Sequence, residues 1–415
     1  MSELVHNFES QVVFSNRKNN ISANEPITFT IAPSGDNNYF DLNASYLTLT
    51  LEAVVNNAVT DKASCKVKCL KNMSGLINNS KVTYTLWNDG NLETITLNSD
   101  NENSGMHRSI LGALRDAKKE HLVAEGLKEF SFIQDTTIAE ANVGDDTNKL
   151  QRAGKDCLFY NYLKFDFEKG SSSATKTIVI PFKDVLEGCS TKRFLNLTQM
   201  DVEMYPQDVS NFFDNYSNLK TTGTGGGNQN VQIFMKDCKA YIHSYVCDNS
   251  DFFDKDDTKL VKDTIQVKTF LIKDGINNCD DRIIYNFPAK YVFIFFTDKS
   301  NNFSKLLDVK LNRISLLMSG EQKRTFIPDY TSTPDQRDIR LWEYLEYIVN
   351  TNNESDYETL LTYRSYVNQF RIIAFPLCEF FAQKATNNLN FEVDIKEKPE
   401  GVTDMNMHVV LVRSD

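Results

Sequence analysis

The stretch that decides the fold runs from Pro33 to Val55, PSGDNNYFDLNASYLTLTLEAVV. It opens with turn-forming residues and then alternates strictly. The residues of one face are Leu47, Leu49, Leu51 and Ala53, and those of the other are Tyr46, Thr48, Thr50 and Glu52. A period of two residues is typical of a β-strand with one face on a core and the other toward water. We therefore expect this strand to lie in an antiparallel sheet with a solvated face.

The same alternation of apolar and polar residues recurs to the end of the chain. Further strands are predicted at 25–31, 82–87, 160–168, 177–182, 200–205, 231–246, 264–272, 291–296, 309–318, 370–375, 389–395 and 407–412. A helix is predicted over 106–126, and a second begins at Thr333, with Pro334 in its first position. A third, shorter helix starts at the capping-box spacing of Ser355 and Glu358. The chain is thus predicted to be mostly β.

Length and composition limit the number of domains and the kinds of partner that the chain can have. A chain of 415 residues is too long for one ordinary core, so two domains are expected. A net charge of −11 argues against extensive contact with nucleic acid, which favours a basic face. There is no apolar run long enough for a transmembrane helix, and the N-terminus does not resemble a signal peptide. The eight cysteines are expected to be free, buried thiols in a reducing compartment.

A Gly/Thr-rich run near the midpoint, TTGTGGGN at 221–228, predicts a flexible, exposed loop. We therefore predict four segments. These are an N-terminal arm over 1–22, a first jelly roll over 23–218, a linker or loop over 219–230 and a second jelly roll over 231–415. Each half would hold about eight short antiparallel strands and one helix-bearing insertion, which points to sandwiches or jelly rolls.

None of the candidate enzyme or metal-binding motifs in the sequence has the residues or the spacing that its chemistry requires. Gly223–Gly227 lacks the Lys-Ser/Thr of a phosphate loop, and His107 and His121 are too far apart to form a ligand pair, so both are expected at the surface. The CKVKC segment at 65–69 lacks zinc spacing, and the acidic segment 251–257 lacks the Gly and the final Glu of a calcium loop. No catalytic, cofactor-binding or metal-binding residue is predicted, and no enzyme activity is expected. A carboxylate pair for glycoside hydrolysis stays open, because such a pair requires only spatial proximity.

Short stretches spread over nearly the whole chain resemble the double jelly-roll major capsid proteins of Polinton/Maverick elements and adintoviruses, which are hexon-like. The matching stretches are Pro26–Ile31, Asn38–Leu42, Tyr46–Leu47, Met73–Ile77, Val82–Leu86, Arg108–Leu111 with Asp116–Lys119 and Leu122, Arg324–Asp329, Tyr366–Phe375 and Leu389–Phe391. Their order and spacing carry the match. Gly75 stands where the family commonly has a bulkier residue, and Phe375-Pro376-Leu377 replaces the usual Phe-Asp-Leu.

The resemblance implies a structural protein of the virion without cofactors. Three copies would form a homotrimer of six jelly rolls, a pseudo-hexameric capsomer that tiles an icosahedral shell around a double-stranded DNA genome. Partners would be the chain itself, neighbouring capsomers, penton proteins and minor capsid proteins, without sequence-specific binding of nucleic acid. Synthesis would take place in the host cytoplasm or nucleus. Insertions at about 98–156 and 331–366 would decorate the capsomer tops or line trimer contacts. The residues alone leave open a two-domain β-sandwich that binds carbohydrate or protein.

Overall fold

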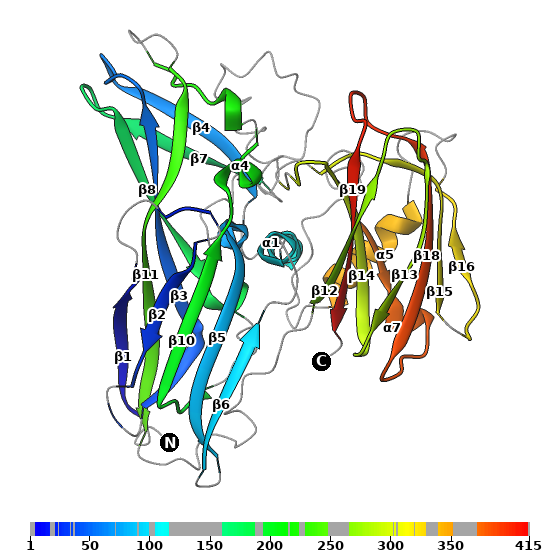
Figure 1. Cartoon of the computed structure of the whole chain (residues 1–415), viewed down its shortest axis with the longest axis horizontal. Coiled ribbons are helices and arrows are strands. Elements are labelled where there is room, and N and C mark those ends of the chain that lie inside the picture. Colours follow the sequence, from blue (N-terminus) through cyan, green and yellow to red (C-terminus); the bar gives the residue numbers. More distant parts are fainter. Residues whose placement is uncertain are drawn as a thin grey trace. The chain divides into compact units, whose positions relative to one another are not determined.

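The structure is a computed structural model of the chain. It describes residues 5–16, 21–23, 25–33, 35, 38–70, 72–88, 91–98, 104–115, 160–186, 194–214, 216–223, 229–247, 265–301, 303, 306–318, 320–328, 339–351 and 372–413. The chain divides into two compact units: Met1–Ile110 with Tyr162–Asp263, and Leu111–Asn161 with Thr264–Asp415. Each unit is built mainly from antiparallel strands (Figure 1).

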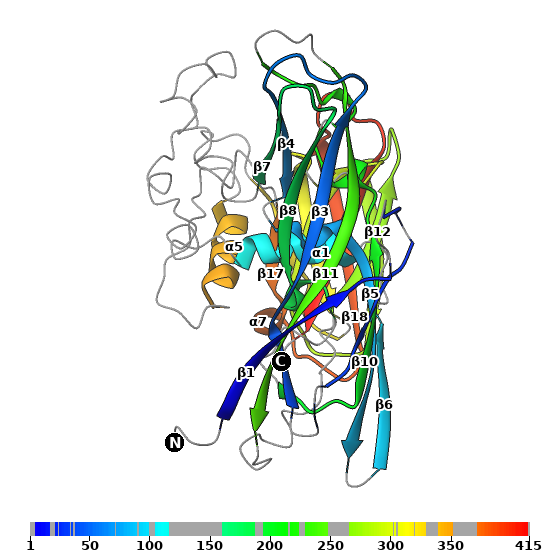
Figure 2. The ribbon, with the colours of Figure 1, turned by 90° about the vertical axis from the view of Figure 1, so that its left-hand side faces the viewer.

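The first unit has two main sheets. One has the order β1 (Val5–Phe14), β11 (Val231–Cys247), β3 (Asn38–Val55), β8 (Ser173–Pro181), and β9 (Phe194–Leu195) also pairs with β3. The other has the order β2 (Ile27–Ile31), β10 (Gln199–Pro206), β5 (Ile77–Asn88), β6 (Asn91–Asn98). A separate pair joins β4 (Ala63–Leu70) and β7 (Tyr160–Phe167). The helical elements are η1 (Met73–Leu76), α1 (Ser104–Arg115), η4 (Phe182–Asp184), α4 (Val209–Phe212) and η5 (Tyr216–Asn218). The turned view shows β3, β8 and β11 side by side (Figure 2).

The second unit has two four-stranded sheets. One has the order β12 (Ile265–Ile272), β19 (Met405–Arg413), β14 (Ala289–Asp298), β17 (Ile373–Pro376). The other has the order β13 (Asn278–Tyr285), β18 (Asn387–Glu397), β15 (Lys310–Met318), β16 (Arg324–Phe326). Its helices are α5 (Ile339–Thr351) and α7 (Leu377–Phe380). The predicted helix start at Thr333 and the short helix from Ser355 lie outside the described residues, as does the predicted helix after Arg115.

Strand order identifies both units as jelly rolls. If the eight strands of the second unit are counted from one to eight along the chain, its sheets read 1-8-3-6 and 2-7-4-5. In the first unit, the eight strands of the two main sheets other than the short β9 give the same two orders. Two Greek keys that place the first strand beside the last define the jelly roll. The chain is therefore a double jelly roll, as the sequence predicted.

The domain boundaries differ from the prediction in two places. β11 was expected to open the second jelly roll, but it is the eighth strand of the first and pairs with β3 from Val231 to Val246. The boundary therefore lies after β11 and not at the glycine-rich segment 219–230. The segment 1–22 was expected to be an arm outside the sandwich, but its residues Val5–Phe14 form β1, the first strand, paired antiparallel with β11. Long-range pairing decides both points, and local composition does not report it.

The core of each jelly roll follows the alternation of its strands. In β3, Leu47, Leu49 and Leu51 are fully buried, as predicted, while Thr48 and Thr50 on the opposite face are half-buried. In the second unit, Phe270 of β12 packs against Phe391 of β18 with their ring centroids 5.1 Å apart, so these side chains face each other between the sheets. Burial of these apolar side chains is the main favourable term for each sandwich.

Candidate assembly surfaces

Long connections gather at one end of each jelly roll. Because neighbouring strands are antiparallel, all connections from an odd to an even strand leave the sandwich at the same end. In the first unit these connections span 15–26, 56–76, 99–172 and 207–230, and those at the opposite end span 32–37, 89–90 and 182–198, so the three longest lie at the first end. In both units the longest connection joins the fifth strand to the sixth, over 99–172 and 327–372. The two predicted insertions therefore occupy equivalent positions in the two jelly rolls.

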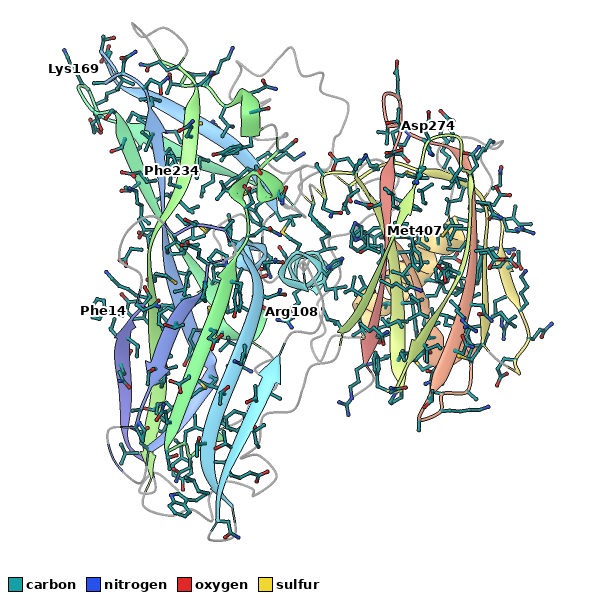
Figure 3. The ribbon with its side chains drawn as sticks, in the orientation of Figure 1. Phe14, Arg108, Lys169, Phe234, Asp274 and Met407 are labelled. Carbon is teal, nitrogen blue, oxygen red and sulfur yellow. The ribbon has the colours of Figure 1, made fainter. Side chains whose placement is uncertain are left out.

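The first insertion is anchored through α1. Ser109 donates a hydrogen bond to the carbonyl oxygen of Asn72, and Arg108, labelled in Figure 3, donates to the carbonyl oxygen of Val185 over 3.2 Å. Met106 and Ile110 are fully buried. His107, expected at the surface, is only 1% exposed, because it lies on the packed side of this short helix. The predicted surface position of His107 is therefore wrong, and His121 lies outside the described residues.

Gly75 makes room for this helix. A Cβ atom at position 75 would lie 2.8 Å from Sδ of Met106 and 3.0 Å from the ring of Phe212. Distances this short force neighbours to move. The departure from the resembled family at Gly75 thus has a local reason in this chain, since the side chain of Met106 fills the space that a larger residue would take.

The second insertion is anchored through α5. Leu341, Leu345 and Ile348 are buried at the usual three- and four-residue spacing of an apolar helix face. Tyr344 packs on Phe375 and Phe380, with ring centroids 5.9 and 5.3 Å apart. Tyr344 therefore packs within its own jelly roll.

Two further aromatic residues of α5 differ in exposure. Trp342 is buried. Tyr347 is exposed, and its hydroxyl donates a hydrogen bond to Glu379 over 3.3 Å. Of Trp342, Tyr344 and Tyr347, only Tyr347 is exposed.

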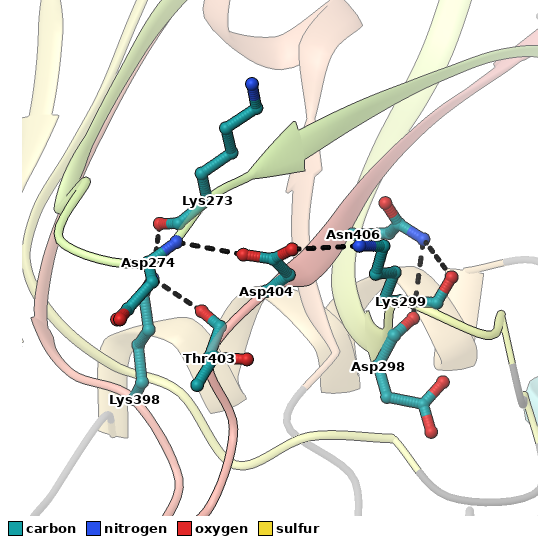
Figure 4. A network of polar contacts seen from close by, with 8 residues as sticks. All are labelled: Lys273, Asp274, Asp298, Lys299, Lys398, Thr403, Asp404 and Asn406. Carbon is teal, nitrogen blue, oxygen red and sulfur yellow. Dashed lines mark hydrogen bonds and ion pairs between the residues drawn. The ribbon is translucent and has the colours of Figure 1, made fainter.

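A polar network fixes three connections at the long-connection end of the second jelly roll (Figure 4). Asp404 accepts a hydrogen bond from the backbone N–H of Asp274 (3.0 Å) and pairs with Lys299 (3.1 Å). The Lys299 ammonium and the Asp274 N–H hold the pKa of Asp404 below its usual range. Lys398 donates to the carbonyl oxygens of Lys273 (2.7 Å) and Thr403 (3.1 Å). These contacts join the turn after β12, the turn after β14 and the loop before β19. They hold the three connections in fixed positions at this end of the jelly roll.

Three of the thiols that the structure describes are buried and of low reactivity, and none belongs to a group of three metal-ligating side chains there. Cys65, Cys69 and Cys238 are buried and unpaired by disulfides, as predicted. Burial raises the pKa of Cys65 to about 11 and those of Cys69 and Cys238 to about 12, which suppresses the reactive thiolate. Cys378 is exposed, contrary to the expectation that it is buried, because in the short helix α7 it is Leu377 that takes the buried position.

The remaining sequence candidates contribute no chemistry within the described residues. No group of three metal-ligating side chains occurs there, and the acidic segment 251–257 lies outside them. Gly223 packs against the backbone of Lys62, where a Cβ atom would lie 2.6 Å from the carbonyl oxygen, while 224–228 is not described. No helix among the described residues combines the length and apolarity that crossing a bilayer requires.

No protein-family model and no curated protein matches the sequence. Among solved structures, the chain is similar to a chain of the Sputnik virophage, with a TM-score of 0.51, 12% identity, and coverage of 99% of this chain and 86% of that one. It is also similar to the mavirus major capsid protein, with a TM-score of 0.52, 10% identity, and coverage of 98% and 87%. At such low identity these likenesses establish the fold, which is the double jelly roll of viral major capsid proteins.

Proposed function

We propose that this chain is a viral major capsid protein that forms homotrimers. The observation that carries the proposal is that one chain holds two jelly rolls of identical strand order, with the longest connection at the same position in each. Three copies then supply six similar units around a closed ring, which is a pseudo-hexameric block. Such blocks can tile an icosahedral shell. The likeness to the mavirus major capsid protein supports this use of the fold.

The orientation in the shell follows from the two ends of each jelly roll. The strands would run roughly perpendicular to the shell, so that one end faces outward and the other inward. We assign the end with the long connections to the outside, because insertions there do not disturb the packing between neighbouring capsomers. Penton and minor capsid proteins would complete the shell, and the lineage would be of the Polinton/adintovirus type.

The proposed cargo is a double-stranded DNA genome that the shell encloses without sequence-specific contacts. The net charge of −11 supports the absence of such contacts, since an acidic protein neutralises few phosphates. The assembled protein would reside in the virion after synthesis in the host cytoplasm or nucleus.

Mass and shape of the purified protein test the proposal. Light scattering should give three times the subunit mass of 47.4 kDa, and negative-stain microscopy should show hexagonal particles. A binding module built from two β-sandwiches would instead be monomeric and irregular in outline. A stable monomer at micromolar concentration would contradict the capsid proposal.

A further inference from the structure

The outer face of the β1–β11–β3–β8 sheet carries a patch that crosses all four strands. Its members are the residues of two neighbouring cross-strand rows, Val12, Tyr241, Tyr46 and Pro181 in the first and Phe14, Lys239, Thr48 and Val179 in the second. The side chains of Val12, Phe14 and Val179 are 42%, 62% and 57% exposed. Tyr46 stacks on Tyr241, with ring centroids 4.9 Å apart and planes inclined by 10°. We call this set the four-strand patch; Phe14 on β1 marks its margin in Figure 3.

The patch lies on the side of the sheet opposite the core. Leu47 and Leu49, which alternate with Tyr46 and Thr48 along β3, are fully buried. On β11, the buried residues Cys238 and Ala240 likewise alternate with Lys239 and Tyr241. Exposed apolar side chains beside a stacked tyrosine pair on the outer face of a sheet are typical of an interaction site.

The equivalent face of the second jelly roll is apolar as well, but it is covered. Phe270 points inward to Phe391, so its neighbour Thr269 points outward. His408 pairs with Thr269, and Phe295 pairs with His408, so both lie in the same outward-facing row. His408 confirms this side by its hydrogen bond with Thr269, 3.2 Å between Nδ1 and Oγ1.

The row beside it contains Val267, Val410, Phe293 and Ala374. Phe295 and Val410 are fully buried and Phe293 is 5% exposed. The same sheet face is therefore covered within the chain in one jelly roll and open in the other.

The low charge of the four-strand patch also favours binding of a second copy of the chain over binding of a strongly charged partner. Among the eight residues of the four-strand patch, Lys239 alone is charged, and it forms an ion pair with Asp237 at 3.2 Å. The whole chain carries −11, so two copies have like net charge and repel each other overall. A nearly neutral patch with stacked tyrosines is where like-charged copies can meet at least cost.

We propose that the four-strand patch is the docking site for a second copy of this chain. This inference rests on the proposed homotrimer and gives it a specific surface. The contact is heterologous, since the patch of one copy meets a different surface of the next, and three such contacts close a ring. In the ring, the outer face of this sheet in every first jelly roll becomes covered, as its equivalent already is in every second one.

A matched pair of charge substitutions tests the surface. Val179 on β8 and Leu92 on β6 are both 57% exposed, but Leu92 belongs to the other sheet and lies outside the patch. Val179→Glu should weaken trimer association about tenfold or more, because it places a charge in an apolar contact. Leu92→Glu should change the association by less than about threefold. Both constants come from sedimentation velocity over a dilution series, with circular dichroism to confirm that the subunits stay folded.

A photo-cross-linking residue identifies the occupant. Benzoylphenylalanine at position 179 should give a covalent product of twice the subunit mass, whereas the same residue at position 92 should give none. A product of single-subunit mass with an internal cross-link would mean that another segment of the same chain covers the patch, and the proposal would fail. Equal association of the two glutamate variants in a trimeric protein would overturn the docking site but leave the proposed function intact. A monomeric wild-type protein would contradict both the docking site and the proposed function.

Discussion

Gly105 of α1 lies so close to the carbonyl oxygen of Ile77 that a Cβ atom at position 105 would overlap this oxygen. The neighbouring carbonyl oxygen of Asn78 would lie 3.0 Å from the same Cβ. Both obstacles are backbone atoms of β5, which cannot rotate away as a flexible side chain can. The first insertion of the chain is therefore held against the first jelly roll at a position where only glycine fits.

Gly105→Ala should destabilise the subunit by about 1–3 kcal/mol, because the helix must move away from β5 and loses the packing of Met106 and Ile110. Denaturant unfolding of the purified protein measures this. Gly35→Ala is the control, since no atom lies within 4 Å of the Cβ it would add, and it should change the free energy of unfolding by less than about 0.5 kcal/mol. Equal stability of the two variants would show that α1 is not seated on β5.

The ion pair of Asp404 predicts a pH dependence. Its folded-state pKa is lowered by Lys299 and by the N–H of Asp274. Stability from this group is therefore fully present above the unfolded-state pKa of about 3.9 and is lost as the pH falls through the lower folded-state pKa. Asp404→Asn should lower the melting temperature at pH 7, and the difference from wild type should vanish in strong acid.

Glu321→Gln, a substitution of an exposed carboxylate at the other end of the same jelly roll, provides the comparison for Asp404→Asn. It should leave the melting temperature nearly unchanged at both pH values. A deficit of Asp404→Asn that persists at low pH would mean that the side chain acts through packing and not through its charge.

Cysteine reactivity reports the packing of β11 and β4. Cys378 is exposed, whereas burial raises the pKa values of Cys69 and Cys238 to about 12. Brief treatment of the native protein with iodoacetamide should label Cys378 before Cys69 and Cys238, which should react only after unfolding. Peptide mass spectrometry gives the order. Labelling of Cys238 as fast as Cys378 would be incompatible with β11 as a central strand.

Alternation along the chain was sufficient to predict most strands, because a one-sided core imposes a period of two. It missed β4, although Cys65, Val67 and Cys69 are buried there, and it also missed edge strands. β1 presents Val12 and Phe14 to solvent, and β13 is held at a sheet edge by backbone pairing with β18, so neither carries the expected pattern. Each of these two edge strands completes one sheet of its own jelly roll, yet composition alone does not distinguish it from a loop.

The role of β11 was hidden for another reason. The residues from Val231 to Cys247 alternate as a strand should, but which jelly roll they join depends on pairing with β3 and β1, far away in the sequence. The glycine-rich run just before β11 suggested a boundary there. The four-strand patch could not be predicted from the sequence either. Its rows combine side chains from four separate strands, and only the strand register brings these side chains together.

The organising strand gives the sharpest test of fold and assembly together. Leu49 of β3 is fully buried, and it faces Cys238 of β11 and Ile178 of β8 in register. Leu49→Ala should destabilise the isolated subunit by about 2–5 kcal/mol, because it leaves a cavity that the neighbours cannot fill. Thr48→Ala, one position away on the opposite face, should cost less than about 1 kcal/mol in the isolated subunit.

Thr48 also lies in the four-strand patch, so its cost should depend on assembly. In the proposed trimer, where a second copy would cover this face, Thr48→Ala should lower the melting temperature more than it does in the dissociated subunit, whereas the effect of Leu49→Ala should be similar in both. Thermal melts above and below the trimer dissociation concentration separate the two cases. Equal losses for Leu49→Ala and Thr48→Ala in the isolated subunit would contradict the one-sided burial of β3, and with it the orientation of the patch.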